Sequence, residues 1–467
     1  MHELTIHLDQ KSKIPMYEQL YEYIKQDIQQ GRLGAGEQLP ARRALSQYLD
    51  VSRSTVDLAY EQLISEGYIE AKARKGCYVS RIEGLYQLSG GPAPAVLVPK
   101  QEKGAYLYDF SPSGIDLDSF PYGIWRKITK NTLLDDKKDL FQLGDPRGDW
   151  ELRETICGYL HQARGVNCMP DQVIVGAGND YLLLLLSTVL GPGQRIVMEN
   201  PTYLHARRIF QQLGYEVLTV GMDTGGMRPK ELEESGGNIA YVMPSHQFPL
   251  GLVMPIKRRL ELLSWAGEAQ GRYIIEDDYD SEFRYKGKPI PALQGSDKEG
   301  KVIYLGTFSR SIAPAIRISY LVLPSELASR WGEALSQFSS TVSRIDQTIL
   351  NRFIKEGYYE RHLNKMRGIY GRKHEVLLSQ MRKLSSVCRI HGEYAGVHLL
   401  VEFTNGMTER EAIARARAQR VRVYPLSAYY QGQQRSAGEQ VLMGYGVLGE
   451  EEILEAGRRL ERAWMGA

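Results

Sequence analysis

The sequence predicts an α/β protein in which a small unit of three helices and a β-hairpin precedes a larger α/β body. Three observations support this fold class. Helical periodicity with glycine stops marks residues 1–80, a stretch with central glycines and prolines marks 81–105, and apolar β-branched runs that lead into polar turns recur beyond residue 106. The length of 467 residues allows about three domains, at roughly 150 residues each.

The first helix is expected over residues 14–28, with Pro15 at its start and Gly31 after its end. Five apolar or aromatic residues share one helical face: Tyr17, Leu20, Tyr21, Ile24 and Ile28. An amphipathic helix therefore opens the chain.

A helix-turn-helix is expected next. Residues 39–49 and 54–67 are predicted helices, and 50–52 form a tight turn between them. In such a motif the second helix lies in the major groove with its N-terminal residues on base edges. Those residues here are Arg53, Ser54 and Thr55. The pattern of residues 68–79 then predicts two strands joined by a basic turn, and this hairpin would form the wing of a winged helix.

Net charge does not separate a DNA-binding unit from an ordinary small helical domain with solvated arginines. Residues 41–80 carry six basic side chains against five acidic ones. The distinction lies in placement, because the basic side chains fall at helix starts and in the wing, whereas the acidic ones fall elsewhere. We therefore predict double-stranded operator DNA as a partner.

Residues 81–105 read as a linker, because glycine and proline stand at their centre and no apolar period runs through them. At about 3.1 Å per residue when extended, such a segment could reach about 75 Å. That reach makes exchange of the N-terminal unit between the subunits of a dimer sterically possible.

A phosphate-binding turn is expected after the apolar strand 301–305. Residues 306–309 offer hydroxyls and backbone amides, while Arg310 and Arg317 follow closely. Phosphate oxygens accept hydrogen bonds from such groups, and arginine presents its donors as a matched fork. The alternative is a strand-to-loop passage with two surface arginines.

Two further strand ends point to the same kind of site. Residues 272–280 run from an apolar strand into carboxylates, so Asp277 and Tyr279 are expected at the carboxyl edge of the sheet, where ligands of open α/β sheets collect. A buried carboxylate could keep a pyridinium protonated, and a phenol could tune a ring oxygen. Residues 172–180 predict a strand, a glycine turn and a helix start, which is a seat for phosphate.

These segments resemble two known families. From about residue 108 onward the chain is similar to the fold-type-I, pyridoxal-phosphate-dependent aminotransferases, with a large α/β domain and a small C-terminal α+β domain. Residues 144–148, 244–251, 276–283 and 306–309 resemble specifically the aminotransferase-like half of the MocR regulators, which include the GabR proteins. Residues 1–80 resemble the winged helix of the GntR family, through the phrases LP-x-x-R-x-L, VSR-x-TV and L-x-x-EG.

The resemblance implies roles for individual residues. It implies a pyridoxal phosphate site with phosphate contacts and hydroxyl or amide donors from Ala177, Gly178, Asn179, Thr307, Ser309 and Arg317. Around the ring it implies stacking by Tyr203, a pyridine-nitrogen partner in Asp277 and a ring-oxygen contact from Tyr279, with help from His246 or Gln247. On DNA it implies contacts from Arg42 or Arg43 and from Arg53, with Lys75 and Gly76 of the wing in the minor groove. It also implies head-to-tail, domain-swapped homodimers.

Arg310 stands where the resemblance places the lysine that holds the cofactor covalently. A guanidinium stays protonated and is a poor nucleophile, so this residue argues against catalysis. Three possibilities stay open. The pocket could bind an unrelated anion, it could hold the cofactor without a covalent bond, or the lysine could have been replaced deliberately.

The resemblance also leads us to expect an effector different from that of GabR-like proteins, which hold the effector carboxylate with an arginine late in the chain. Ala428 stands at that position here. Arg422 lies nearby, but it occupies an alternating strand and is expected to face solvent.

We therefore expect a winged-helix domain over 1–80, a linker over 81–105, a large domain over 106–345 and a small domain over 346–467, with a long helix around 347–372. The expected function is a DNA-binding transcription regulator that senses a small effector. The alternative is a pyridoxal-phosphate-dependent aminotransferase that carries a DNA-binding arm. The four cysteines show no metal spacing and are expected to be buried reduced thiols. With no signal peptide or membrane span in the sequence, we expect a cytoplasmic protein with no metal site.

Overall fold

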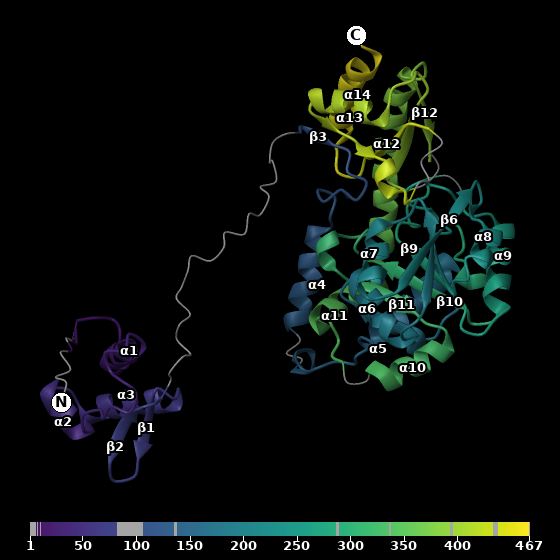
Figure 1. Cartoon of the computed structure of the whole chain (residues 1–467). Helices are drawn as coiled ribbons and strands as arrows, with labels where there is room; N and C mark the ends of the chain where they lie inside the picture. The colour runs from purple at the N-terminus through teal and green to yellow at the C-terminus, as the bar shows by residue number, and fades with distance from the viewer. Residues whose placement is uncertain are drawn as a thin grey trace. The chain divides into compact units, whose positions relative to one another are not determined.

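The computed structural model of the chain describes residues 6, 8–9, 11–81, 106–134, 138–285, 289–335, 338–392, 396–432 and 438–466, without the side chains of 333–335. These residues fall into two compact units, one within Met1–Gln101 and one within Glu102–Ala467 (Figure 1). Each unit is described by itself. All but the first residue of the expected linker 81–105 lies outside the described residues, so its reach and domain exchange stay predictions.

The N-terminal unit is the predicted helix-turn-helix with a wing. Its helices and antiparallel strands are α1 (Met16–Gln29), α2 (Arg42–Tyr48), α3 (Arg53–Ser65), β1 (Ile69–Lys72) and β2 (Gly76–Val79). Leu20, Tyr21 and Ile24 of α1 are buried as predicted, whereas Tyr17 and Ile28 are only half-buried. The Ser52 hydroxyl caps α3 by accepting a hydrogen bond from the amide of Thr55 at 3.2 Å.

The second helix begins later than predicted. The sequence suggested a start at residue 39, but α2 starts at Arg42 and Ala41 is extended, with φ −61° and ψ 137°. The reason is that the Leu39 amide donates to the carbonyl of Cys77 at 2.9 Å. The segment before α2 is thereby tied to the wing rather than to the helix.

The second unit is built on a mixed sheet of eight strands among the described residues, in the order β4-β11-β10-β9-β8-β5-β6-β7. The strands are β4 (Val173–Gly176), β5 (Arg195–Asn200), β6 (Glu216–Asp223), β7 (Gly226–Met227), β8 (Ile239–Val242), β9 (Tyr273–Asp278), β10 (Val302–Thr307) and β11 (Ser319–Val322). Strands β8, β9 and β10 pair in parallel, and β11 is antiparallel to both β10 and β4. The carboxyl ends of β4, β8, β9 and β10 therefore meet at one edge of the sheet.

Helices cover this sheet (Figure 1). They are α4 (Tyr122–Leu134), α5 (Trp150–Arg164), α6 (Asn179–Leu190), α7 (Leu204–Gln212), α8 (Pro229–Glu234), α9 (Ile256–Gly267), α10 (Ser325–Leu335) and α11 (Arg344–Lys355). Strands β4 and β9 form within the segments 172–180 and 272–280, where strands were predicted. Strand β10 continues through Gly306 and Thr307, which pair with Tyr320 and Ser319, so the turn expected at 306 begins two residues later.

A smaller antiparallel sheet has the order β12-β13-β16-β15, with β12 (Cys388–His391), β13 (His398–Phe403), β15 (Tyr424–Pro425) and β16 (Gln440–Gly444). Helices α12 (Tyr358–Lys383), α13 (Glu409–Ala418) and α14 (Glu450–Met465) pack with it. Strand β3 (Tyr108–Asp109) pairs with β14 (Val421–Arg422), so a segment from the start of this unit lies beside its end (Figure 1). Phe110 is buried in the same core as α12 and α14.

The long helix expected around 347–372 is in fact two helices. Helix α11 ends at Lys355 and α12 begins at Tyr358, because Gly357 adopts a left-handed conformation with φ 74°. Residues of α11 and the first turn of α12 pack in a core with β4 and α5. The domain division expected at 345/346 stays a prediction.

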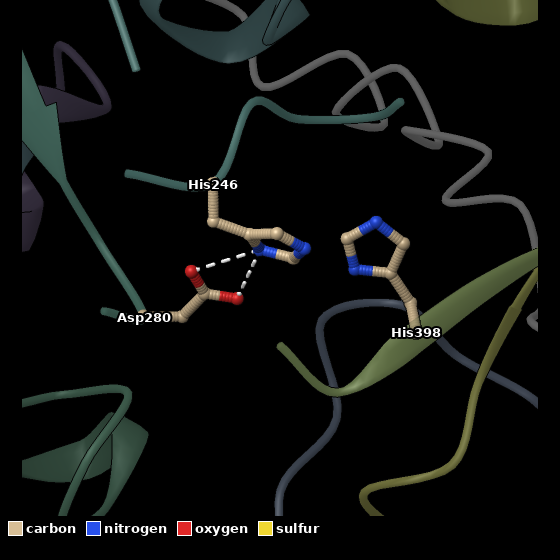
Figure 2. A group of neighbouring side chains, drawn as sticks. All are labelled: His246, Asp280 and His398. Atoms are coloured by element: carbon tan, nitrogen blue, oxygen red, sulfur yellow. Dashed lines mark hydrogen bonds and ion pairs between the residues drawn. The ribbon is translucent and has the colours of Figure 1, made fainter. Parts of the chain in front are cut away.

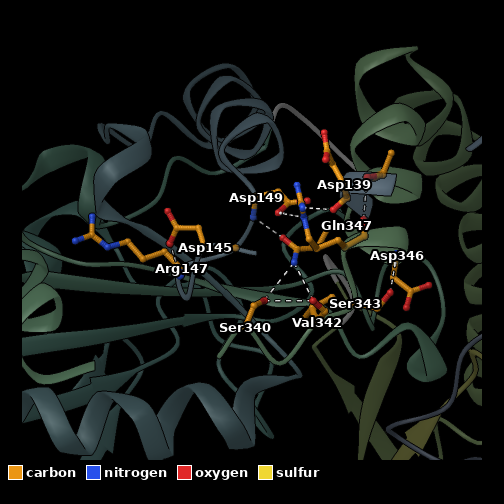
Figure 3. Close-up of polar contacts among 12 residues, drawn as sticks. Asp139, Asp145, Arg147, Asp149, Ser340, Val342, Ser343, Asp346 and Gln347 are labelled. Atoms are coloured by element: carbon orange, nitrogen blue, oxygen red, sulfur yellow. Dashed lines mark hydrogen bonds and ion pairs between the residues drawn. The ribbon is translucent and has the colours of Figure 1, made fainter. Parts of the chain in front are cut away.

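The turn at 144–149 joins three elements beside the sheet (Figure 3). The Gln347 side chain of α11 accepts from the Asp149 amide at 2.7 Å and donates to the Val342 carbonyl at 2.9 Å. The Arg147 carbonyl accepts from Val175 of β4 at 2.8 Å. A Cβ at Gly148, whose φ is 95°, would lie 2.7 Å from Val175. This motif therefore fixes β4, α5 and α11 together.

No helix within the described residues is both long and apolar enough to cross a membrane. Cys77, Cys157 and Cys388 are buried free thiols, as expected. Cys168 is only half-buried, and its sulfur lies 3.5 Å from that of Cys157.

Candidate functional site

A cavity of about 580 Å³ opens at the carboxyl edge of the large sheet. Nine residues singled out from the sequence line it: Gly178, Asn179, Tyr203, Asp277, Tyr279, Thr307, Ser309, Arg310 and Arg317. They come from the ends of β4, β9 and β10 and from the segments that follow β5 and precede β11. The parallel strand ends thus gather residues that are up to about 140 positions apart in sequence, as Gly178 and Arg317 are.

Three other predicted residues do not reach the wall of this cavity. The amide of Ala177 donates to Thr341 Oγ1 at 3.1 Å. Gln247 is buried and donates to the Pro201 carbonyl at 3.0 Å, and His246 is buried behind Tyr279. Their positions favour a supporting role for these residues over direct contact with a ligand.

Sequence reasoning missed several lining residues, namely Ser111, Pro112, Ser113, Ile115, Asp180, Met243, Phe248, Pro314, Ser319, Tyr424 and Tyr429. Phe248 lies within the polar turn 244–251 and could have been found there. Residues 111–115 and the two tyrosines carry no local signal, because only the fold brings these distant segments to the sheet edge.

One end of the cavity is suited to an anion. Gly178, with φ 94°, is the N-cap of α6, and a Cβ there would lie 2.5 Å from Nη2 of Arg317. Arg317 forms an ion pair with Asp180 at 3.2 Å. Ser309 Oγ is buried without a hydrogen-bond partner in the described structure, so its hydroxyl is available to donate. Donors at a helix N-terminus beside an arginine form a seat for phosphate.

Asp277 lies at the base of the cavity with an unusual set of partners. Tyr241 donates to Oδ2, whereas Oδ1 is buried and has no partner among the described residues. Burial raises the pKa of Asp277 to about 7, and the Tyr241 hydrogen bond only partly opposes that rise. A buried carboxylate with one free oxygen calls for a cationic donor, such as a protonated ring nitrogen.

Tyr279 contacts a group of three buried polar residues, His246, Asp280 and His398, through its hydroxyl; the three are drawn together in Figure 2. The Tyr279 hydroxyl lies 3.0 Å from His246 Nδ1, which is also 2.9 and 3.0 Å from the two oxygens of Asp280. His398, on β13, faces His246 with its ring 5.1 Å away, and burial lowers the pKa of His398 to about 3. The small sheet is therefore packed against residues that hold the pocket's phenol.

Arg310 enters the cavity from the turn after β10. Its Nη2 donates to the Pro112 carbonyl at 2.6 Å, and its Nε is buried without a partner. Within the described part of the chain, no carboxylate forms an ion pair with it, in contrast to Arg317.

The late-chain residues weighed from sequence lie apart from this cavity wall. Ala428 is exposed on a short 3₁₀ turn at Ser427–Tyr429. Arg422 is exposed, as expected, and pairs with Asp109 at 3.3 Å. Neither lines the cavity.

The raised pKa of Asp277 gives a testable dependence of stability on pH. An unfolded aspartate titrates near about 3.9, so a folded pKa of about 7 gives stability that is present at low pH and lost as pH rises toward 7. Replacing Asp277 by asparagine should therefore make the ligand-free protein lose less stability between pH 5 and 8. Denaturant unfolding at both pH values measures the difference, up to a few kcal/mol at about 1.4 kcal/mol per pKa unit.

The matched control is Glu199→Gln, which removes a second buried carboxyl whose pKa burial raises to about 7, but which lies outside the cavity wall. Both variants should flatten the pH dependence. An unchanged pH dependence in Asp277→Asn would contradict the burial argument.

The N-terminal unit presents a second candidate surface. Arg43, Arg53, Ser54, Lys75 and Gly76 are exposed, and Arg42 and Thr55 are half-buried. Arg42 and Arg53 both approach Asp57, at 3.3 and 3.7 Å. The wing turn is anchored where Gln38 donates to the Lys75 carbonyl at 2.8 Å, and Gly76 has φ 100°. The N-terminus of α3 and the wing tip thus present basic side chains to solvent.

Comparisons with known proteins match both units. Residues 16–79 match the family of bacterial regulatory proteins named gntR, and residues 118–434 match the class I and II aminotransferases. The chain is 39% identical to the HTH-type transcriptional regulator YdeL of Bacillus subtilis, over 99% of both chains. It is 31% identical to the probable rhizopine catabolism regulatory protein MocR of Rhizobium meliloti, covering 98% of this chain and 95% of that one.

A solved structure shares the fold of the second unit. The kynurenine aminotransferase of Pyrococcus horikoshii, in complex with PMP, aligns with a TM-score of 0.68 at 26% identity. The alignment covers 78% of this chain and 92% of that chain.

Proposed function

Because the chain belongs to the MocR-like transcriptional regulators, in which a GntR-type helix-turn-helix domain is joined to an aminotransferase-like domain, we propose that this second domain is its sensor. In this proposal the sensor binds pyridoxal phosphate or an amine adduct of it without a covalent bond. Occupation of the cavity would bias how two winged helices of a homodimer meet operator DNA, which is a coupling between two sites.

The unpartnered oxygen of Asp277 is the observation that carries the proposal. It lies in the same cavity as the phosphate seat formed by Gly178, Asn179 and Arg317, and as the aromatic ring of Tyr203. A phosphorylated pyridine would supply an anion for the seat, a flat ring for Tyr203 and a protonated nitrogen for Asp277. Burial disfavours a bare carboxylate at Asp277, so a cationic partner there would be favourable.

Tyr279 would hold the ring oxygen, since the buried His246 and Asp280 pair fixes its hydroxyl. When bound, pyridoxal phosphate supplies a ring that withdraws electrons from an attached amine. The residues of this chain bind and orient that ring, and none of the nine predicted lining residues is a lysine.

We further propose that the protein is not an aminotransferase. Arg310 lines the cavity, but a guanidinium stays protonated and does not add to an aldehyde under ordinary conditions. The named regulators that match the chain over nearly its whole length support the same reading.

The test is to mix the purified protein with pyridoxal phosphate and to record absorbance before and after gel filtration. We expect the wild-type protein to keep an aldehyde band through gel filtration and to lose it on extensive dialysis. The variant Arg310→Lys should instead show a red-shifted Schiff-base band that survives dialysis and is lost on borohydride reduction.

The matched control is Arg317→Lys, which places a new lysine in the same cavity but at the phosphate seat; it should give no dialysis-resistant band. Absence of retained absorbance in the wild-type protein and in Arg310→Lys alike would refute a pyridoxal phosphate site. The cavity would then serve an unrelated anion.

A further inference from the structure

The cavity contains two arginines in different electrostatic states. Arg317 is paired with Asp180 at 3.2 Å. Arg310 donates only to the neutral Pro112 carbonyl in the described structure, and its Nε is buried and unpartnered. A cation held in a partly buried cavity without a counterion is unfavourable unless an anion joins it.

Arg310 lines the cavity, is only half-exposed and has a buried Nε. Burial raises the pKa of Tyr203 to about 12, and the positive charge of Arg310 opposes that rise, which places the two side chains in one electrostatic environment. Burial likewise raises the pKa of Tyr279 well above its usual range, and the positive charge of Arg310 again opposes the rise. Arg310, Tyr203 and Tyr279 all line the cavity, so a ligand bound there would lie close to the guanidinium.

We propose that Arg310 is the carboxylate receptor of the sensor, so that the preferred ligand is a phosphopyridoxyl compound whose amine substituent carries a carboxylate. This inference rests on the proposed function for the ring and the phosphate. The phosphate lies against Arg317 and the carboxylate against Arg310, with the ring between Tyr203 and Asp277. Each anion then meets one arginine, and the charge at Arg310 is compensated.

The inference also accounts for the absence of an arginine at position 428. Ala428 is exposed, and Arg422, which pairs with Asp109, does not line the cavity. Among the described residues that line the cavity, Arg310 and Arg317 are the only permanent cations. A ligand carboxylate in this cavity therefore has Arg310 as its remaining partner.

The experiment compares two stable secondary amines, N-(5′-phosphopyridoxyl)glycine and N-(5′-phosphopyridoxyl)methylamine, by isothermal titration of the full chain. They differ only in the carboxylate, and neither contains an aldehyde. Charge-assisted hydrogen bonds are worth about 1.5–3 kcal/mol, so the wild-type protein should prefer the acid by roughly tenfold to a hundredfold. In Arg310→Gln this ratio should fall to about one.

Two variants complete the design. Arg310→Lys keeps the positive charge but loses the two parallel N–H donors of the guanidinium, so its preference for the acid should be intermediate. Neither compound contains an aldehyde, so the new lysine cannot form a Schiff base with it. Arg422→Gln removes an exposed arginine outside the cavity and should keep the wild-type ratio. Because each ratio is taken within one protein, a general weakening of the pocket cancels.

A wild-type ratio near one, or an unchanged ratio in Arg310→Gln, would overturn the role of Arg310 while leaving phosphopyridoxyl binding in place. If neither compound binds the wild-type protein, both the inference and the proposed function fail. A further titration, of pyridoxamine phosphate in the presence of free glycine, tests whether the carboxylate must be linked to the phosphopyridoxyl group. If free glycine increases the affinity as much as the linked carboxylate does, the ligand need not be a single adduct, and that part of the inference would be overturned.

Discussion

Replacing Arg53 by alanine is expected to weaken operator binding by roughly tenfold to a hundredfold for each winged helix engaged, because a bidentate arginine–guanine contact contributes about 1–3 kcal/mol. The side chain stands at the first residue of α3 and is 72% exposed. Its contact within the protein is a 3.7 Å approach to Asp57, and such exposed pairs contribute at most about 1 kcal/mol. The fold should therefore remain intact.

The measurement is a gel-shift or anisotropy titration against an operator selected from random duplexes by the wild-type protein. Arg53→Lys separates the two roles of this residue. A lysine can keep a phosphate contact but not the fork, so it should lose discrimination at one base pair while retaining most of the salt dependence. Lys13→Ala removes an exposed basic residue outside α2, α3 and the wing and serves as the control. Equal operator affinity for Arg53→Ala and the wild-type protein would show that α3 does not read DNA in this way.

The N-terminal unit could be predicted nearly completely because its signals are local. Helix periodicity, the Ser52 cap and the glycines that follow α1 and α3, Gly31 and Gly67, lie within a few residues of the features they specify. The largest boundary error, at residue 39, arose from a contact across the unit, the hydrogen bond from Leu39 to Cys77, whereas the other helix ends differ by one or two residues. Such a bond has no local signature in the sequence.

The candidate pocket was predictable to the extent that strand ends define it. Asp277 and Tyr279 line the cavity because residues at the end of a buried parallel strand emerge at the carboxyl edge of the sheet. His246 was expected near the ring but lies behind Tyr279, since its ring is drawn toward Asp280. Pro112, which accepts the hydrogen bond of Arg310, reaches the cavity only through tertiary folding.

The electrostatic state of the pocket could not be read from the sequence either. That Arg317 is paired and Arg310 is not depends on where Asp180 and Pro112 lie in space. The sequence identified the substitution at 310, and the fold gives it a chemical consequence.

Substitution of Gly178 by alanine is expected to abolish detectable binding of phosphopyridoxyl compounds, with an affinity loss of a hundredfold or more, on the order of 3 kcal/mol. The added Cβ would lie 2.5 Å from Nη2 and 2.7 Å from Cζ of Arg317. Arg317 is long and half-exposed, so it would move away from Gly178 and leave the phosphate seat without its cation. Alanine would also fill the space in which the backbone approaches the phosphate.

Gly178 has φ 94°, so part of any effect could come from backbone strain rather than from the lost seat. Gly191→Ala isolates that part, because Gly191, at the other end of α6, has φ 75° and ψ 176°, close to the φ 94° and ψ 166° of Gly178, with nothing within 4 Å of its Cβ position. Both variants should lose about 1 kcal/mol of folding stability, but only Gly178→Ala should lose the ligand. Titration of N-(5′-phosphopyridoxyl)glycine into both variants decides the question. If binding survives in Gly178→Ala, the phosphate does not lie between α6 and Arg317, and the orientation that places the carboxylate at Arg310 must be reversed.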